Sequence, residues 1–395
     1  MIEVFYFVSM MVVGVSAPYF PPYLHGLGFS GQQISTVLSV PPLLALAVPL
    51  AWAWVADRTK QHARVLRIAC TGACLAFLPL LFARRFGAIL PAYFGYAIFY
   101  TGIGGLTDSL AIARMQAGGD YGRMRVWGSA GFMAAALLAG LLLTWRATEH
   151  AADPLVPGLI FASLLAAAIA SRRLHGMGES GARPHLRDLR QLFANPRFRL
   201  LLLAAPLHWA CCAPYNAFFG ILLRDRHLPP AVLGVAFCVG VAGEMLVFVR
   251  FSRLRARLDL DTMLAIAFGA SALRWLLVSQ VDSIGAVMVL QLVHCLTYGL
   301  FWAAGIAVVG ESAPPHLRAT GQAFFVVSVV GVGNIIGNFG AGALYDLGGT
   351  ASYAFLAAGF AELIPLALAI AARRRRLAGA VPGAAASQGA VSRDT

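Results

Sequence analysis

Twelve apolar stretches, each long enough to cross a lipid bilayer, constrain the fold of this chain more than any other feature of its sequence. A helix of about 20 apolar residues spans the hydrocarbon core of a bilayer, and a helix satisfies its own backbone hydrogen bonds there. The sequence therefore predicts an all-α membrane protein with twelve transmembrane helices. The predicted helices cover residues 4–24, 32–55, 65–83, 88–113, 124–145, 155–172, 199–223, 231–250, 262–281, 285–310, 319–345 and 351–372.

The composition agrees with this class and excludes others. Hydrophobic residues make up 59% of the 395 positions and charged residues 12%, a balance that a soluble domain of this size does not need. The net charge of +13 comes from basic residues that fall almost entirely on one side of the predicted membrane. We therefore expect a lipid bilayer, and no nucleic acid, as the partner. The first stretch has no basic segment before it, so we expect a retained helix and not a cleaved signal peptide.

Lysine and arginine residues set the predicted orientation, because cytoplasmic connections of membrane proteins are rich in them. With the N-terminus inside, the outer connections hold only Arg84, Arg85, Arg146, Arg224 and Arg226. We therefore expect a multi-pass protein of the bacterial inner membrane with both termini in the cytoplasm.

The chain is predicted to divide into two pseudo-symmetric halves of six helices. Ala17-Pro18-Tyr19 in the first predicted helix recurs as Ala213-Pro214-Tyr215 in the seventh. Parallel repeats of this kind build a central cavity between the halves of one transporter architecture. The predicted segments are an N-terminal half at 1–172, a cytoplasmic linker at 173–198, a C-terminal half at 199–372, and a basic, disordered cytoplasmic tail at 373–395.

Five charged or titratable residues lie within or at the edge of the apolar stretches. An ionised group at the centre of a membrane helix costs roughly 2.5–3.5 kcal/mol or more, so such groups line water-filled pathways or pair with one another. Asp108 and Arg125 flank one connection at equal depth, and Arg274 and His294 flank another. We expect each pair to share a level in the membrane, with Glu244 deeper towards the inside.

Two sequence motifs resemble the major facilitator superfamily. Asp57-Arg58, after the second predicted helix, resembles the Asp-Arg core of its G-x-x-x-D-R signature, with Ala53 in place of the glycine. Residues 120–132, DYGRMRVWGSAGF, resemble the opening of the fifth helix in the lactose permease branch. Gly243-Glu244, Arg274 and His294 are similar to charged positions on the eighth, ninth and tenth helices of that branch. The resemblance covers essentially all of 1–372 and implies the twelve-helix transporter fold.

Two departures narrow the resemblance to one group. Thr297 stands where lactose permease carries a glutamate that is central to proton release, and Phe132 stands where it carries a sugar-stacking tryptophan. Residues 292–299, LVHCLTYG, look more like the phenylpropionate permease group. Substrates in that group are aromatic carboxylic acids taken up with protons, so the resemblance implies an organic acid as substrate.

The candidate site residues follow from these observations. We assign no catalytic residue and no metal ligand. Gln291, His294 and Tyr298 lie on one face of the tenth predicted helix, because they are three and seven residues apart. The predicted substrate-binding residues are Arg125, Arg274, His294, Tyr298, Gln291 and Phe132. The predicted proton-coupling residues are Asp108, Glu244 and His294, and the predicted gating residues are Asp57 and Arg58.

Purely structural interpretations stay open beside these roles. In this interpretation, Asp108 and Arg125 form a structural ion pair that holds two helices together, and Arg274 and Glu244 only stabilise the fold. His208 and Glu362 are weaker candidates for a functional role. For Glu362, in the twelfth predicted helix near Pro365, we favour a packing role. The six cysteines lie within apolar stretches without metal-ligand spacing, which indicates packing.

Three classes of function remain. The first is proton-coupled uptake of a small organic anion by alternating access, with the proton gradient in place of a cofactor, because no ATP-binding motif is present. The second is the same fold carrying a neutral sugar or nucleoside, or exporting hydrophobic compounds. The third class, a polytopic membrane enzyme, is the least favoured of the three. We therefore expect no enzymatic activity. A carrier of this architecture is expected to function as a monomer.

Overall fold

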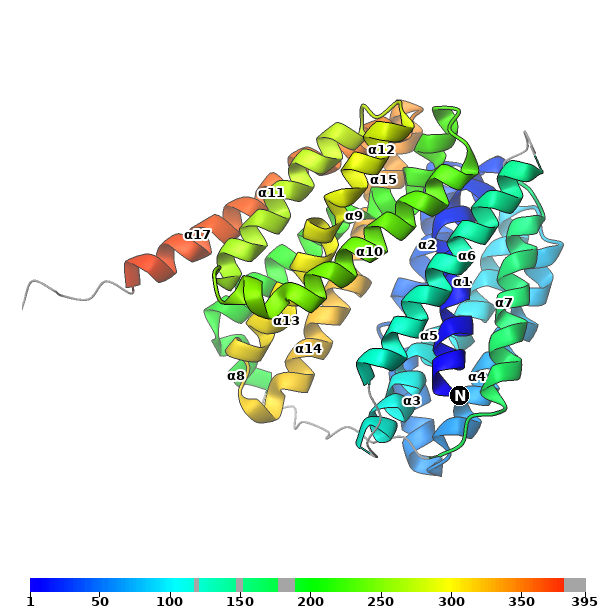
Figure 1. Cartoon of the computed structure of the whole chain (residues 1–395), viewed down its shortest axis with the longest axis horizontal. Coiled ribbons are helices and arrows are strands. Elements are labelled where there is room, and N and C mark those ends of the chain that lie inside the picture. The colour runs from blue at the N-terminus through cyan, green and yellow to red at the C-terminus, as the bar shows by residue number, and fades with distance from the viewer. Residues whose placement is uncertain (117–120, 147–151, 177–188, 380–395) are drawn as a thin grey trace, which may run out of the picture.

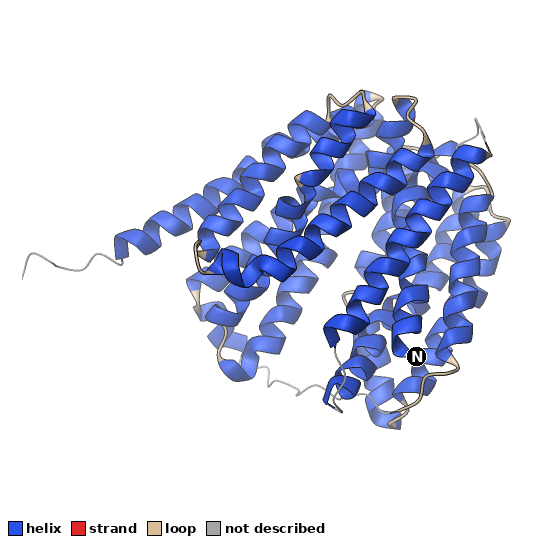
Figure 2. Ribbon diagram, in the orientation of Figure 1, coloured by secondary structure: helices blue, strands red, loops and turns tan. Residues whose placement is uncertain are grey.

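A computed structural model describes the chain except residues 117–120, 147–151, 177–188 and 380–395. The described residues form helices and connecting turns, and no strand occurs among them (Figure 2). Residues 177–188 of the predicted linker and residues 380–395 of the predicted disordered tail lie outside the described residues. Residues 373–379 of that tail are not disordered, because they continue α17 as helix. The protein is an all-α, multi-pass membrane protein.

Helices from the first part of the chain gather on one side of the molecule, and those from the second part gather on the other (Figure 1). The first group consists of α1 (Ile2–Gly26), α2 (Gly31–Leu44), α3 (Val48–Thr59), α4 (His62–Phe77), η1 (Leu78–Leu81), α5 (Phe86–Gln116), α6 (Tyr121–Trp145) and α7 (Leu155–Ser171). The second group consists of α8 (Leu189–Ala194), α9 (Pro196–Asp225), α10 (Pro230–Arg255), α11 (Leu260–Val278), α12 (Ile284–Leu292), η3 (Cys295–Leu300), α13 (Phe301–Ser312), η4 (Pro315–Leu317), α14 (Arg318–Val326), η5 (Val327–Gly333), α15 (Asn334–Gly348), α16 (Ala351–Ala361) and α17 (Leu363–Gly379).

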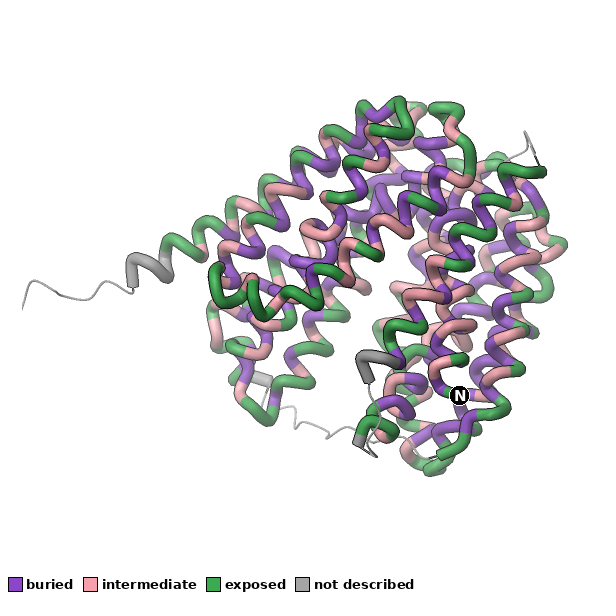
Figure 3. The backbone as a smooth tube through the Cα atoms, viewed as in Figure 1, coloured by how far each residue is buried: buried purple, intermediate pink, exposed green. Residues whose placement is uncertain are grey.

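Every predicted transmembrane stretch is helical. Ten helical stretches among the described residues are long and apolar enough to cross a membrane, and α7 is a shorter apolar helix. The remaining predicted stretch, 199–223, lies within the 30-residue α9. Large apolar side chains such as Leu141 and Val249 face outwards, while buried residues fill the interior of the bundle (Figure 3).

Several stretches are interrupted helices, which the apolar pattern did not predict. The stretch 32–55 breaks into α2 and α3 just after Pro41 and Pro42, which lack the N–H donors that a helix needs. The stretch 285–310 contains a π-helical segment, η3, directly after His294. The stretch 319–345 contains a second π-helical segment, η5. Such π segments are frequent at functional sites because they shift the direction of side chains.

The two groups of helices contact one another through α1 with α9, α2 with α15, and α6 with α10. Hydrogen bonds join the groups where α1 ends and α2 begins, and we call this the closed end of the bundle. There the Asp346 carboxylate accepts hydrogen bonds from the backbone N–H groups of Gly31 and Gln32 at 2.5 and 2.9 Å. Thr144 Oγ1 likewise accepts from the N–H of Ala231 at 3.0 Å. The N-termini of α2 and α10 are therefore each capped from the opposite group.

Small residues allow the close approach of helices at the closed end. A Cβ atom added to Gly342 on α15 would lie 2.5 Å from the carbonyl oxygen of Gly31 on α2. A Cβ atom added to Gly234 on α10 would lie 2.5 Å from the carbonyl oxygen of Ala136 on α6. Side chains larger than hydrogen would therefore separate the two groups at these contacts.

Candidate functional site

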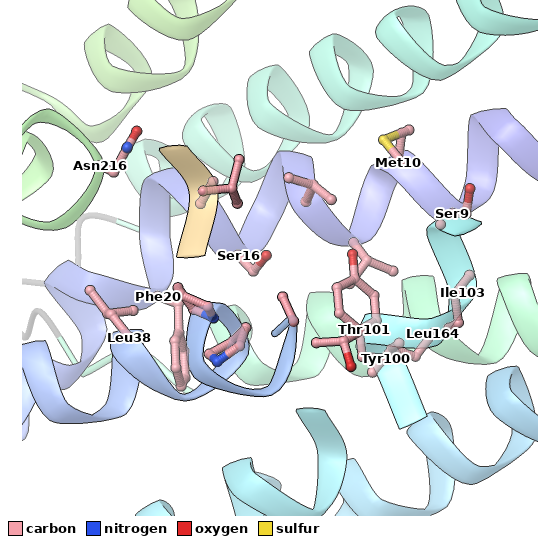
Figure 4. Close-up of a pocket in the computed structure, with 18 of the residues that line it drawn as sticks. Ser9, Met10, Ser16, Phe20, Leu38, Tyr100, Thr101, Ile103, Leu164 and Asn216 are labelled. Atoms are coloured by element: carbon pink, nitrogen blue, oxygen red, sulfur yellow. The ribbon is translucent and has the colours of Figure 1, made fainter. Parts of the chain in front are cut away.

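A cavity of about 550 Å³ extends along α1 between the two groups of helices. Its lining comes from α1, α2, α5, α6 and α7, with contributions from α9, η5 and α15. Figure 4 shows Ser16, Thr101 and Asn216 around this space, among the apolar side chains of Phe20 and Leu38. The cavity is large enough for a small organic molecule, whose site is typically apolar with a few polar groups.

Asp108 and Arg125 are the charged residues among those that line the cavity in the described structure. Arg125 Nη1 lies 3.5 Å from Asp108 Oδ1, so the two share a level as the sequence predicts. The hydroxyl group of Tyr6 donates to the same oxygen at 2.6 Å. The side chains of Arg125 and Asp108 are 58% and 39% exposed, so both reach the water of the cavity.

Arg274 lies in a different environment, wholly buried within the second group of helices. Its Nη1 donates to His294 Nδ1 at 3.0 Å and to Thr297 Oγ1 at 2.9 Å, and its Nη2 donates to Gln291 Oε1 at 3.1 Å. The guanidinium group also faces the ring of Tyr215, with 4.8 Å to the ring centroid. The expected pairing of Arg274 with His294 is therefore present, as one part of a dry polar network.

His294 joins Arg274 to the carboxylate of Glu244. Its Nε2 lies 2.7 Å from Glu244 Oε1, and its ring stacks on that of Tyr298 with 4.2 Å between centroids. Glu244 therefore reaches Arg274 through the imidazole, and its side chain is 23% exposed. Gly240 on α10 allows this arrangement, because an added Cβ atom there would lie 2.8 Å from the His294 ring.

The predicted substrate-binding residues thus fall into two places. Arg125 lines the cavity, whereas Arg274, His294, Gln291 and Tyr298 do not in this conformation. The role of these four residues in substrate binding stays a prediction, as does that of Phe132. The ring of Phe132 packs against Phe237 of the opposite group, with 6.2 Å between centroids.

Asn216 connects the cavity to the buried network, and sequence reasoning missed it. Its side chain lines the cavity, and its Oδ1 accepts from the Tyr298 hydroxyl at 3.4 Å. The preceding residue, Tyr215, donates from its hydroxyl group to Gln291 Oε1 at 3.2 Å. The repeated Ala-Pro-Tyr segment was the available signal, because Asn216 directly follows its second copy.

Asp57 and Arg58 lie on α3, away from the cavity lining. Asp57 Oδ1 lies 3.1 Å from His62 Nε2, and the guanidinium group of Arg58 lies 5.5 Å from the ring centroid of Trp54. The first contact joins α3 to α4, and the second lies within α3. A gating role for the two residues stays a prediction.

His208 and Glu362 form a buried pair, although the sequence indicated them only as weak candidates and favoured packing for Glu362. His208 Nδ1 contacts Glu362 Oε1, and both side chains have no solvent exposure. His208 Nε2 lies 3.0 Å from the carbonyl oxygen of Thr297. The pair therefore touches the residue that also accepts a hydrogen bond from Arg274.

No group of histidine, cysteine, aspartate and glutamate side chains within the described ranges could hold a metal ion. The six cysteines are free, and four of them are buried. The candidate site therefore consists of polar and charged side chains around a cavity.

Comparisons with known proteins agree with this architecture. The chain is 29% identical over 333 residues to a maltose permease of Geobacillus stearothermophilus, covering 83% of this chain and 82% of the relative. It is 26% identical over 307 residues to a probable 3-phenylpropionic acid transporter of Escherichia coli, covering 74% and 77%. Its fold is similar to the crystal structure of the nucleoside transporter NupG, with a TM-score of 0.83, 18% identity and coverage of 94% and 97%.

The model of one protein family matches residues 1–357, which is most of the chain. The fold, the cavity between two groups of helices and the relatives all agree with that match. The chain belongs to the MFS_1 like family of the major facilitator superfamily, and it is a membrane transporter of that superfamily.

Proposed function

We propose that this protein is a secondary active transporter that takes up a small organic anion with an apolar, aromatic-like body together with protons. The observation that carries the proposal is the Asp108–Arg125 pair on the otherwise largely apolar wall of the cavity. The guanidinium fork of Arg125 suits a carboxylate, and the apolar wall suits the body of the substrate. The relative named as a probable 3-phenylpropionic acid transporter supports this choice.

Exchange of partners at Arg125 would couple the anion to protons. A substrate carboxylate that binds Arg125 competes with Asp108, whose carboxylate then keeps the Tyr6 hydroxyl as its partner. A carboxylate that loses a neighbouring cation binds a proton more readily. Asp108 is therefore a proposed proton acceptor on the cavity side. Glu244 and His294 are proposed to take part in proton coupling through their contacts with each other and with Arg274.

Alternating access is proposed to proceed by rocking of the two groups of helices, at 1–172 and 199–372, with the closed end facing outwards. The hydrogen bonds at the closed end would break in an outward-open state. This assignment places both termini in the cytoplasm and the protein in the inner membrane, as the distribution of basic residues favours. We also propose that the protein functions as a monomer, because residues of one chain line the cavity.

A neutral solute is the second candidate substrate. The maltose permease relative favours a sugar, and the hydroxyl groups of Ser9, Ser16 and Thr101 on the cavity wall offer hydrogen bonds to one. Export of a hydrophobic compound uses the same fold in the opposite direction.

Uptake into proteoliposomes with an imposed proton gradient tests the proposal. Initial rates are measured for 3-phenylpropionate, maltose and a nucleoside, with and without a protonophore. Protein-free liposomes are the control, because a weak acid crosses lipid unaided. We expect saturable, protonophore-sensitive uptake of the acid above this control. Uptake of maltose or the nucleoside alone would establish the second candidate, and uptake that survives the protonophore would exclude proton coupling.

A further inference from the structure

His208 and Glu362 lie against one another in the buried interior of the second group of helices. His208 is on α9, and Glu362 lies at the break between α16 and α17, where Pro365 lacks the N–H that would donate to Ala361. Neither side chain has any solvent exposure. The second carboxyl oxygen of Glu362, Oε2, is buried without a hydrogen-bond partner among the described residues.

The hydrogen-bond partners of His208 determine how many protons the pair holds. A carbonyl oxygen can only accept, so the Nε2 atom that faces the Thr297 carbonyl carries a proton. In a regular α-helix the N–H of Phe301 would donate to this carbonyl, but at the end of the π-helical segment η3 it donates to the Tyr298 carbonyl instead. The remaining atoms, His208 Nδ1 and Glu362 Oε1, would both be acceptors if no proton lay between them. Their contact therefore requires one shared proton.

His294 has the opposite arrangement, although it also contacts a glutamate. Arg274 can only donate, so the Nδ1 atom of His294 accepts and carries no proton. The Nε2 atom then carries the single proton of a neutral imidazole and donates it to Glu244. The contacts of His294 therefore fix it as a neutral link, and the extra proton lies at His208 and Glu362.

The net charge of the buried network also indicates one shared proton at His208 and Glu362. With both histidines neutral, Arg274 carries one positive charge against the negative charges of Glu244 and Glu362, and one shared proton restores neutrality. A neutral network is far less costly to hold within a membrane than a charged one. The other titratable groups beside the pair among the described residues are the thiols of Cys211 and Cys212 on α9.

We propose that His208 and Glu362 form a proton-binding site that holds one exchangeable proton and couples it to transport. This inference rests on the proton-coupled uptake proposed above, and it assigns the buried proton to residues other than His294. Arg274 connects the site to the rest of the network, because Thr297 accepts from Arg274 with its side chain and from His208 with its carbonyl. A change in the hydrogen bonds of Arg274 therefore affects His208 through one shared residue, Thr297.

A crevice lies near the end of the bundle where α9 and α11 begin, on the way from the pair to the surface. It has a volume of about 30 Å³, which is room for a water molecule, and Arg197, Asp261 and Phe268 contribute to its lining. The ring of Phe268 packs on that of His208, with 5.0 Å between centroids. One aromatic ring therefore separates the pair from the crevice.

Nitrogen NMR of purified protein with isotope-labelled histidine tests the site without any substrate. We expect one imidazole in the wild type to have both ring nitrogens bearing or sharing a proton. This signal should be absent from His208→Gln and should become that of an ordinary neutral imidazole in Glu362→Gln. A wild-type His208 signal with an unprotonated, unshared Nδ1 would overturn the proposal.

Transport in proteoliposomes tests the coupling, with 3-phenylpropionate as the probe and protein-free liposomes subtracted. Glu362→Gln cannot release a proton, so we expect it to keep exchange of internal for external substrate and to lose stimulation by an imposed proton gradient. Glu362→Asp retains a carboxyl group and should keep part of the stimulation. Full stimulation of Glu362→Gln would overturn the proposal. No stimulation of the wild type would instead contradict proton-coupled uptake, and the NMR result would still decide the proton site.

Glu311→Gln is the matched control for Glu362→Gln. Glu311 pairs with Arg197 at 2.7 Å and with Arg255, and its side chain is 40% exposed at the end of α13. The same chemical change there leaves the buried network intact, so we expect normal gradient stimulation. Loss of both exchange and stimulation in Glu362→Gln and in Glu362→Asp, with a lowered melting temperature, would show a structural role and contradict the proposal.

Discussion

Asp346 on α15 caps the N-terminus of α2 from the opposite side of the protein, with its Oδ1 atom 2.5 Å from the backbone nitrogen of Gly31. Thr144 on α6 caps α10 in the same reciprocal way. Each cap satisfies N–H groups that a helix cannot bond internally, and the charge of Asp346 also interacts favourably with the helix dipole. Opening of the closed end must break both caps, so the two residues bias the protein towards the conformation described here.

Asp346→Ala should therefore favour the outward-open state. Loss of an exposed cap costs about 0.5–1 kcal/mol, which corresponds to a shift of about two- to fivefold in the ratio of the two conformations. Spin labels at Arg85 and Asp282, exposed residues near this end in opposite groups, measure the shift as an increased distance. Thr144→Val should act in the same direction. An unchanged distance distribution in the double variant would show that the caps do not control opening.

Arg125 should be essential for transport and nearly dispensable for stability. An ion pair with this exposure contributes about 0–1 kcal/mol to stability, so Arg125→Ala should melt near the wild-type temperature. Arg125→Lys should keep the charge and lose most of the uptake, because lysine lacks the bidentate fork. Initial uptake rates and melting curves provide the measurements, with Arg114→Ala at the end of α5 as the control. Near wild-type uptake by Arg125→Ala would remove the residue from the site.

The sequence predicted the helices well because bilayer-spanning segments must be long, apolar and internally hydrogen-bonded. It also placed Asp108 beside Arg125 and Arg274 beside His294, since residues equally distant from one connection lie at one depth in antiparallel helices. It did not predict the π segment after His294, which depends on contacts with other helices and not on local residue types.

Side-chain direction was the main limit on predicting the site. Depth in the membrane is readable from spacing, but the rotation of each helix follows from packing. Arg274 thus lies in a buried network and not on the cavity wall, although it contacts His294 as expected. The role of Asn216 was missed because its direction depends on the rotation of α9. The contact between His208 and Glu362 was missed because the two residues are 154 positions apart, and no sequence pattern relates such distant positions.

Arg274→Lys should destabilise the protein more than Arg125→Lys does. Arg274 satisfies three buried acceptors, and each acceptor that lysine leaves unsatisfied costs roughly 1–3 kcal/mol. Melting followed by the fluorescence of tryptophan, including the adjacent Trp275, compares the two variants. If Arg274 also binds the substrate carboxylate in another conformation, calorimetry will show a preference for 3-phenylpropionate over its neutral amide that the variant loses. Equal melting temperatures would contradict the structural importance of the network.

Asn216→Ala should weaken substrate binding and leave folding largely intact. The Asn216 side chain faces the cavity and accepts from the Tyr298 hydroxyl at 3.4 Å, a long hydrogen bond that adds little to stability. Removal of the Asn216 side chain breaks the contact between the cavity and Tyr298, whose ring stacks on His294. Binding of substrate in the cavity would then no longer change the contacts of the buried network.

We therefore expect a raised KM for uptake and a reduced response to the proton gradient in Asn216→Ala. Asn334→Ala is the matched control, because Asn334 also lines the cavity but donates to the Val330 carbonyl in the adjoining segment η5, within the same stretch of chain. An equal loss of gradient response in both variants would mean that Asn216 acts only as part of the cavity wall. A selective loss in Asn216→Ala would identify it as the residue through which the substrate reaches the charges of the second group.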